Sequence, residues 1–223
     1  NTFLQIIIYK FNHFPLYLCV CNSFFGHGRE DSHHFIQERR HHKRRSNRNL
    51  WSEHGRILPE RPVFTLDPLF HAGAYYVQDS SSMFVGHAFR KILEQVRKPE
   101  GRPLRVLDLC AAPGGKTTDL AASLREALGD DFILVSNEVM KARAGVLAAN
   151  VAIWGDPNVV VTYDDPSAFT SLTGYFDIIL ADVPCSGEGM FRKDPEVMKT
   201  WDEERPEFFA KLQRAVAIAS LIL

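Results

Sequence analysis

The sequence contains little cysteine and no long uninterrupted apolar segment. Four cysteines in 223 residues are too few for the disulfide framework of a secreted domain, which favours a reducing, cytoplasmic setting. The most apolar stretch, residues 1–25, is interrupted by Lys10, Asn12, His13 and Pro15, well short of the roughly 20 residues that span a bilayer. It also lacks the basic start and small-residue cleavage site of a signal peptide. Secreted and membrane proteins are therefore disfavoured.

The net charge is only −1 at pH 7, but it is unevenly distributed. Residues 1–55 carry eight lysines and arginines against four acids, and seven of the nine histidines. The run RRHHKRRSNRN, residues 39–49, is typical of a solvated segment, with a nucleic-acid-binding tail as the alternative. Cys19, Cys21 and the nearby histidines lack the paired spacing of a structural zinc site, so no metal is expected. Residues 1–54 are predicted to be an irregular basic, histidine-rich segment.

Residues 55–100 are predicted to lead into the main domain, and residues 101–223 to form it. Three prolines within ten residues indicate an extended start, and apolar spacing predicts a helix over 80–96. Apolar runs then alternate with helical patterns. Strands are predicted over 104–109, 132–137, 158–163 and 176–182, and helices over 117–128, 141–154 and 206–223. This alternation predicts an α/β fold with a doubly wound, mostly parallel sheet covered on both faces.

The link between the first strand and the first helix of this domain, DLCAAPGGKTTDL, is a glycine turn. Gly114 and Gly115 let the backbone approach a ligand, and the helix start behind them offers free amides and a positive dipole end. Such a turn suits a carboxylate or a phosphate. A P-loop would need glycine where the sequence has Cys110, and Pro113 removes an amide donor from the cradle. A nucleotide triphosphatase is therefore disfavoured.

Acids follow the other three predicted strands: Glu138 the second, Asp164 and Asp165 the third, and Asp182 the fourth. The carboxyl ends of parallel strands meet at one edge of the sheet, where Glu138 is placed to accept hydrogen bonds from ribose hydroxyls. Each acid alone is more typical of a surface carboxylate or a loop cap. Together, beside the glycine turn, they predict a nucleoside pocket.

A cysteine follows the last of these acids in the segment ADVPCSGEGMFRKDP. Cys185 lies three residues after Asp182, and Arg192 and Lys193 follow beyond flexible glycines. Neighbouring cations favour a thiolate, which makes Cys185 a candidate catalytic thiol, with a small core cysteine as the alternative. Cys110, at an apolar strand end, is better explained as structural.

Several segments, in order and spacing, resemble the Nop/Sun family of RNA cytosine-5 methyltransferases, in particular its bacterial subgroup acting on 16S ribosomal RNA. They are LPERPVFTLDPLFHAGAYYVQDSSSM, LDLCAAPGGKTTDLA, SNEVMKARAGVLAANVAIWG, VVVTYDDPSAF and FDIILADVPCSGEGMFRKDP. The resemblance covers about residues 55–223. It implies a Rossmann-like fold, S-adenosylmethionine as methyl donor, and RNA, either 16S ribosomal RNA or the small ribosomal subunit, as partner.

The resemblance also implies roles for single residues. Glu138 would hold the ribose of the donor, Asp165 would lie beside the adenine, and Asp182 would lie between the donor and the target cytosine. The backbone of the glycine turn would lie near the methionine part of the donor. The turn residues are Cys110, Ala111, Ala112, Pro113, Gly114, Gly115 and Lys116.

The helix after Glu138 fits the family pattern of an acid followed by arginine, leucine and asparagine. The matching residues are Arg143, Leu147 and Asn150, and the resemblance makes Arg143 a candidate RNA contact. Arg192 and Lys193 are further candidates.

The chemistry explains why a thiol and a carboxyl group are needed. Cytosine carbon 5 is a poor nucleophile until a thiolate adds to carbon 6, and Asp182 is the candidate to share a proton with ring nitrogen 3. Family members use one cysteine, in a Pro-Cys pair, to assist product release, and a second, in a Thr-Cys pair, to attack. Cys185 matches the first, and nothing up to Leu223 matches the second. Its position alone equally allows Cys185 to be the attacking thiol.

By the family pattern, the C-terminal strands are missing and the fourth strand is predicted to be a bare apolar edge. We therefore expect an incomplete core, catalytically inactive as it stands, in a cytoplasmic and monomeric protein. One alternative is a non-catalytic RNA-binding protein that keeps the donor-binding fold. Another is a methyltransferase for a small molecule or a protein, which VPCSGEGMFRK disfavours because that chemistry needs no such thiol.

Overall fold

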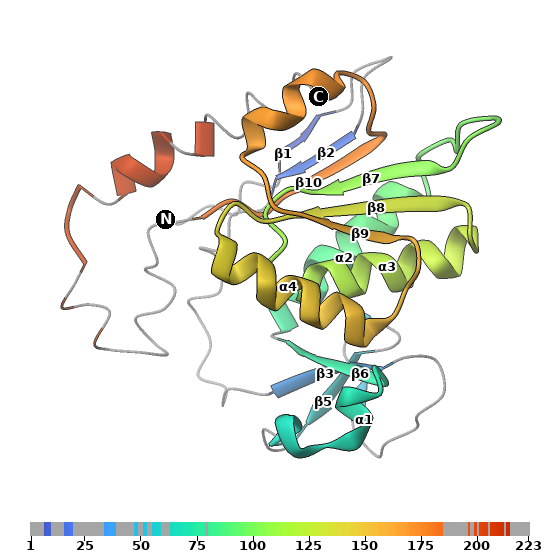
Figure 1. Ribbon diagram of the computed structural model, residues 1–223, viewed down its shortest axis with the longest axis vertical. Coiled ribbons are helices and arrows are strands. Elements are labelled where there is room, and N and C mark those ends of the chain that lie inside the picture. The colour runs from blue at the N-terminus through green and yellow to red at the C-terminus, as the bar shows by residue number, and fades with distance from the viewer. Residues whose placement is uncertain are drawn as a thin grey trace.

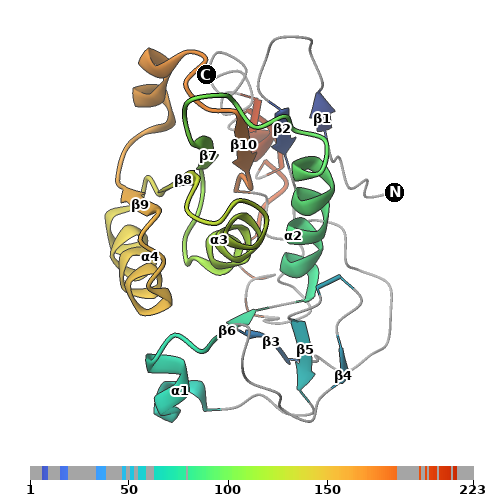
Figure 2. The ribbon, with the colours of Figure 1, turned by 90° about the vertical axis from the view of Figure 1, so that its right-hand side faces the viewer.

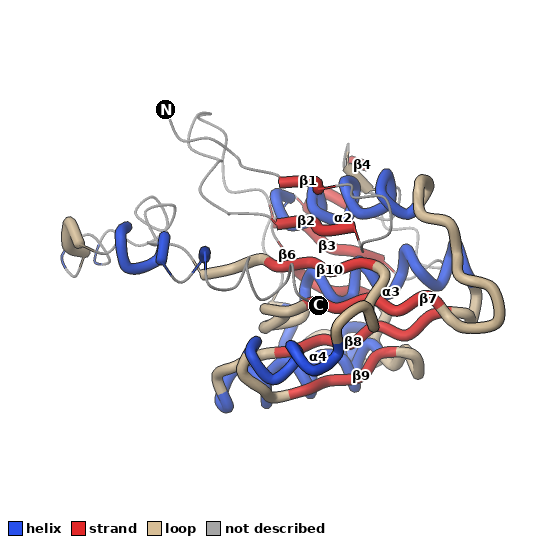
Figure 3. Tube along the Cα trace, turned by 90° about the horizontal axis from the view of Figure 1, so that it is seen from above, coloured by secondary structure: helices blue, strands red, loops and turns tan. Residues whose placement is uncertain are grey.

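The computed structural model describes residues 7–9, 16–19, 34–38, 47–48, 51–52, 55–58, 63–78, 80–184, 196, 199, 201–204, 206–211 and 213–214. Within the described residues, its larger sheet has six strands, which Figures 1 and 3 show side by side. Their order is β1 (Ile7–Tyr9), β2 (Leu16–Cys19), β10 (Ile178–Ala181), β7 (Leu104–Asp108), β8 (Phe132–Asn137) and β9 (Val159–Thr162). All are parallel to their neighbours except β1, which is antiparallel to β2.

Three helices lie on one face of this sheet: α2 (Ser80–Leu93), α3 (Gly115–Leu128) and α4 (Lys141–Trp154). Figure 2 shows them as a layer between the larger sheet and a smaller one. Fully buried Phe89, Leu120 and Leu134 belong to the main core between these helices and the sheet. On the opposite face, among the described residues, Phe169 of the 3-10 helix η2 (Pro166–Leu172) packs against the sheet with Phe176.

The smaller sheet is antiparallel, in the order β4 (Asn47–Arg48), β5 (Gly55–Leu58), β3 (His34–Glu38) and β6 (Tyr75–Gln78). The 3-10 helix η1 (Phe64–Leu66) and α1 (Pro68–His71) precede β6. Asp67 caps α1 by accepting a hydrogen bond from the Leu69 amide at 2.9 Å, and it also accepts one from the Tyr75 hydroxyl at 2.7 Å. These two bonds fix the turn that aims β6 at α3, which it contacts.

The segment between α1 and β6 docks on the end of α4. A Cβ atom added at Gly73 would lie 2.1 Å from the carbonyl oxygen of Ile153, so only glycine permits this approach. The φ angle of Gly73 is also positive, at 68°. The smaller sheet is thereby held against the helix layer of the parallel domain.

The fold class predicted from the sequence is confirmed, and so are the elements of the parallel region. The strand over 132–137 and the helix over 141–154 have the predicted bounds, while the other strands and α2 are shorter by one to three residues at their ends. Residues 206–211 and 213–214 are helical, and the rest of the predicted helix over 206–223 lies outside the described residues. None of the helices among the described residues is long and apolar enough to cross a membrane.

Two expectations are wrong. Residues 1–54 are not irregular throughout, because they include β1 and β2 of the larger sheet and β3 and β4 of the smaller one. The fourth strand of the parallel region, β10, is not a bare edge either. Its residues Ile178–Ala181 pair in parallel with Leu16–Cys19 of β2, so a segment far away in the sequence satisfies its backbone donors and acceptors. The division of the chain at residues 54 and 100 stays a prediction.

Candidate active site

The glycine turn follows β7 at the carboxyl edge of the parallel sheet. The Ala111 amide donates to the carbonyl of Asn137 at 2.8 Å, which ties the turn to the neighbouring strand. Gly114 has φ 113° and caps α3, a conformation that side-chain-bearing residues rarely adopt. The first backbone bond of α3 runs from Thr118 N to Gly114 O, so the amides of residues 115–117 precede it. These are the amides that the sequence analysis predicts could bind an anion, and their role stays a prediction.

Two carbonyl groups of the turn, those of Ala112 and Pro113, accept hydrogen bonds from α4. Arg143 Nη2 donates to the Ala112 carbonyl at 2.8 Å, and Asn150 Nδ2 donates to the Pro113 carbonyl at 2.7 Å. Tyr76 of β6 adds a longer hydroxyl contact of 3.4 Å to the same Pro113 carbonyl. The turn therefore accepts hydrogen bonds both from α4 and from β6 of the smaller sheet.

Glu138, which is predicted to accept hydrogen bonds from ribose hydroxyls, directly follows β8. Its side chain is 3% exposed. One carboxylate oxygen accepts from the Met140 amide at 3.0 Å, and the other lies 3.3 Å from Nη1 of Arg143. Each carboxylate oxygen has a second lone pair, so the group retains acceptor capacity in a fixed direction.

Asp182 follows β10 and pairs with the glycine turn. Its carboxylate oxygen Oδ2 lies 2.7 Å from Nζ of Lys116, and the two side chains are only 13% and 15% exposed. The pair brings together a residue predicted to bind the donor and the one predicted to act on the base. Sequence spacing gives no sign of this contact, because Lys116 lies in the first turn of α3 and Asp182 follows β10, far away in the sequence.

Asp165 differs from the other predicted acids because it is exposed and its hydrogen bond is local. It caps η2 by accepting from the Ser167 amide at 2.8 Å, and the Ser167 hydrogen bonds lower the pKa of its carboxyl group. Among the described residues, the structure brings it into no hydrogen bond or ion pair with the turn, Glu138 or Asp182. It stands at the end of β9, as predicted from the sequence.

A further acid, Asp108, was not predicted. It ends β7, is fully buried, and accepts a hydrogen bond from Thr117 Oγ1 at 2.8 Å. Burial raises its pKa to about 7, opposed by this hydrogen bond and by the nearby Lys116 charge. The signal was present in the sequence, since an acid directly before Leu109 interrupts an apolar strand.

Cys110 is the other thiol of interest within the parallel region. It is a partly buried free cysteine at the start of the turn, and burial raises its pKa to about 12. A thiol with that pKa stays protonated at neutral pH, which fits a structural role better than a nucleophilic one.

Other residues at this edge were missed by sequence reasoning. Asn137 is fully buried and its side chain joins three strand ends, donating to the carbonyls of Leu109 and Asp164 and accepting from Thr162 and the Asp164 amide. A cavity of about 220 Å³ lies between the turn and β6. Besides the turn, it is lined by Tyr76, Val77 and Gln78 of β6 and by Ser82 of α2.

Three predicted site residues, Cys185, Arg192 and Lys193, lie outside the described residues. The continuously described stretch that contains Asp182 ends at Pro184. Of the predicted RNA contacts, only Arg143 is described, and its guanidinium contacts the turn and Glu138 while 46% of its side chain is exposed. Within the described part of the chain, no group of three or more metal-ligating side chains is found.

The sequence matches a protein-family model and is similar to proteins of known name. The family model for 16S rRNA methyltransferase RsmB/F matches residues 95–222. Ribosomal RNA small subunit methyltransferase F of Shewanella loihica is 41% identical over 144 residues, 64% of this chain and 28% of the relative. The protein of the same name from an Escherichia coli strain is 38% identical with the same coverage. The chain therefore spans less than a third of the length of these relatives.

Solved structures share the fold. The crystal structure of PH0851 has a TM-score of 0.70 at 22% identity and covers 87% of this chain and 44% of its own. NSun6 from Pyrococcus horikoshii, solved with SFG, has a TM-score of 0.53 at 27% identity and covers 73% and 38%. Because the family model covers more than half of the chain and relatives of the same name match the same region, the chain belongs to the 16S rRNA methyltransferase RsmB/F family.

Proposed function

We propose that this chain binds S-adenosylmethionine at the carboxyl edge of its parallel sheet, and that the protein methylates carbon 5 of a cytosine in 16S ribosomal RNA. The proposal depends on one observation. The glycine turn follows β7, and the buried carboxylate of Glu138, held by two contacts, follows the neighbouring strand β8. Membership of the family and the name of the relatives, ribosomal RNA small subunit methyltransferase F, support the RNA acceptor.

The residues fit the donor by size and charge. A Cβ atom at Gly115 would lie 2.9 Å from the Gln78 side chain, so glycine keeps the space beside the turn open. The amides of residues 115–117 suit the donor's carboxylate, and Glu138 suits its ribose hydroxyls. The structure of the relative NSun6 with SFG, an analogue of S-adenosylmethionine, supports this choice of donor. We place Asp165 beside the adenine, at the end of β9.

We assign Lys116, Asp182 and Cys185 different roles in the methyl transfer. When bound, S-adenosylmethionine supplies an electrophilic methyl group on a positively charged sulfur. Lys116 fixes one oxygen of Asp182 at 2.7 Å, which sets the direction of that carboxyl group at the end of β10. We assign Asp182 to share a proton with ring nitrogen 3 of the cytosine, and Cys185, three residues later, to the covalent step or its reversal.

The partner in this proposal is 16S ribosomal RNA or the small ribosomal subunit, and the setting is the cytoplasm. Arg192 and Lys193 are proposed RNA contacts on the strength of their charge and position after Cys185. Arg143 was predicted as a third contact. Its described bonds point to a different role, which is argued below.

The function is tested on the complete product of the gene that contains this chain. The protein is incubated with methyl-labelled S-adenosylmethionine and unmodified 16S ribosomal RNA, and the digested RNA is analysed by mass spectrometry. We expect 5-methylcytidine, and its loss in Asp182→Asn. A label on another nucleoside atom, on protein, or on nothing would contradict the proposal.

The role of Cys185 is tested in the same protein by a denaturing gel. We expect Cys185→Ala to leave methyl transfer intact but to retain a covalent protein–RNA band, because release of the product is blocked. Absence of both the band and 5-methylcytidine would make Cys185 the attacking thiol.

A further inference from the structure

Three residues of α4 meet the glycine turn along one stripe of the helix. Arg143, Leu147 and Asn150 are four and three residues apart, a spacing that places side chains on the same face. Leu147 is fully buried, and its Cδ1 lies 3.3 Å from the position that a Cβ atom would take on Gly114. The turn therefore rests directly on this stripe.

The two polar members of the stripe hold successive carbonyl groups of the turn. Arg143 donates to Ala112 at 2.8 Å and Asn150 donates to Pro113 at 2.7 Å. A peptide plane whose carbonyl is held cannot rotate, so these bonds fix the chain just before the first amides of α3. The direction of the amides at residues 115–117 is therefore set in part by α4.

Arg143 also reaches the second half of that site. Its Nη1 lies 3.3 Å from the Glu138 carboxylate, while its Nη2 holds the Ala112 carbonyl. A guanidinium can bridge the two because its donors form a rigid planar fork, which the single ammonium group of lysine does not offer. One side chain thus fixes the distance between the glycine turn and the ribose acceptor.

We propose that Arg143 and Asn150 are positioning residues for donor binding, with Leu147 as their apolar support, and that Arg143 acts through Glu138 and the turn instead of contacting RNA. The proposal rests on the proposed donor site. It makes the stripe on α4 the part of the molecule that sets the geometry of that site.

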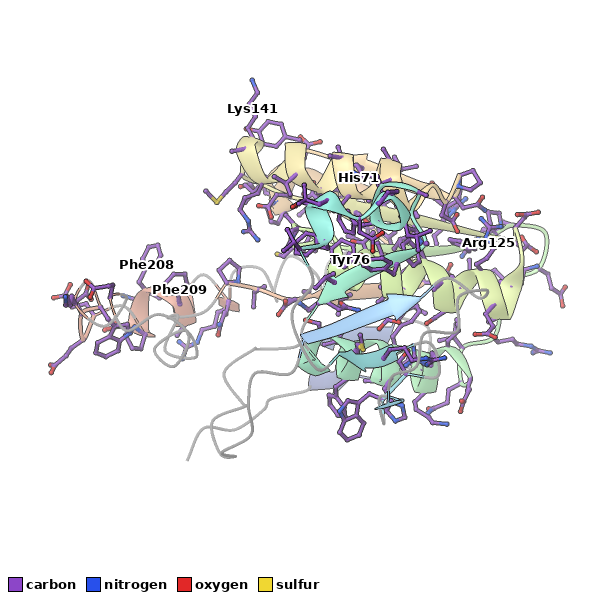
Figure 4. The ribbon with its side chains drawn as sticks, turned by 90° about the horizontal axis from the view of Figure 1, so that it is seen from below. His71, Tyr76, Arg125, Lys141, Phe208 and Phe209 are labelled. Atoms are coloured by element: carbon purple, nitrogen blue, oxygen red, sulfur yellow. The ribbon has the colours of Figure 1, made fainter. Side chains whose placement is uncertain are left out.

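The test compares substitutions in the stripe with a matched one outside it. Arg143→Met removes both contacts, Arg143→Lys keeps the charge without the fork, and Asn150→Asp keeps the shape without the amide donor. Lys141→Met is the control, because Lys141 is an exposed cation on the same helix and Figure 4 shows it pointing away from the body of the protein. S-adenosylhomocysteine affinity, RNA affinity and melting temperature are measured for each chain.

We expect each of the three stripe variants to bind S-adenosylhomocysteine roughly tenfold more weakly at temperatures where it is folded, since each loses a hydrogen bond that sets the site. Lys141→Met is expected to bind it like the unchanged chain. RNA affinity should fall no further in Arg143→Met than in Lys141→Met.

Two results would overturn the inference. If Arg143→Met and Asn150→Asp bind S-adenosylhomocysteine as tightly as the unchanged chain, the stripe does not position the donor site. A fall in melting temperature would then mean that it only stabilises the fold. A loss of RNA affinity in Arg143→Met that Arg143→Lys restores would make Arg143 an RNA contact. Failure of the unchanged chain to bind S-adenosylhomocysteine is a separate result, which removes the proposed donor site and this inference with it.

Discussion

The two sheets contribute to the candidate site in different ways. The parallel sheet provides the glycine turn and every acid proposed to hold the donor, at the ends of β7 to β10. Among the described residues, the antiparallel sheet provides β6, whose Tyr76 and Gln78 line the cavity beside the turn. The proposed donor-binding residues thus belong to the parallel sheet, whereas the shape of the cavity depends on how the antiparallel sheet packs against it. Substitutions in the two regions should therefore have effects of different kinds.

The largest expected effect concerns the buried acid of the parallel sheet. Burial raises the pKa of Asp108 from 3.8 to about 7, so the folded state binds its proton more tightly than the unfolded state does. Its contribution to stability is full below pH 4 and is lost as the pH rises to about 7, at about 1.4 kcal/mol for each pKa unit. Asp108→Asn should therefore raise the free energy of unfolding by a few kcal/mol at pH 8 and hardly at all at pH 4.

Urea titrations at the two pH values check this expectation, with Asp165→Asn as the control. The pKa of Asp165 is lowered, so its contribution is present at high pH and is lost on acidification. Asp165→Asn should not stabilise the chain at pH 8. An Asp108→Asn effect of the same size at pH 4 and pH 8 would contradict the buried-acid account.

The second effect concerns the docking of the antiparallel sheet. Gly73→Ala places a methyl group against the Ile153 carbonyl and forces alanine into a left-handed conformation. We expect a loss of about 3 kcal/mol in the free energy of unfolding, combining about 1–2 kcal/mol for the conformation with the cost of overpacking.

Gly174→Ala is a matched control for Gly73→Ala. Gly174 has φ 69°, against 68° for Gly73, but no atom lies within 4 Å of its added Cβ position. Denaturant unfolding should show only the conformational cost, about 1–2 kcal/mol. Equal losses in the two variants would mean that the contact with α4 does not hold the sheets together.

The elements of the parallel region could be predicted because residues close together in the sequence determine each of them. Gly129 and Gly155 end their helices, and each strand is a short, mostly apolar run that ends in a polar residue or is followed by one, so neighbouring residues determine the pattern. The acids at the strand ends followed from the same reasoning. Their contacts did not, because Lys116 and Asp182 meet only after two strands have paired side by side.

The antiparallel region depends on pairings that sequence periodicity cannot show. β6 follows a proline-rich segment and finds its partner in β3, about forty residues earlier. β2 pairs with β10 from the other end of the chain, which is why the predicted bare edge was wrong. The signal for β6 is the short run Tyr75–Gln78, which is rich in residues that favour strands, but the three prolines before it favour an extended lead-in.

The smallest effect concerns RNA affinity from the basic run. Replacing Arg39, Arg40, Lys43, Arg44 and Arg45 with glutamine removes charge without deleting β3 or β4. If this run contacts phosphates, RNA affinity should fall about tenfold at low salt, and the slope of affinity against salt should become shallower. Filter binding at several salt concentrations measures both, and identical slopes would show that the run does not touch RNA.

The most direct test of the central claim, donor binding at the parallel sheet edge, is calorimetric titration of the 223-residue chain with S-adenosylhomocysteine. The account predicts binding by the unchanged chain, a loss of at least about tenfold in Glu138→Ala because a buried acceptor for the ribose is removed, and a smaller loss in Asp165→Ala because that acid is exposed. Binding that survives both substitutions unchanged would contradict the account.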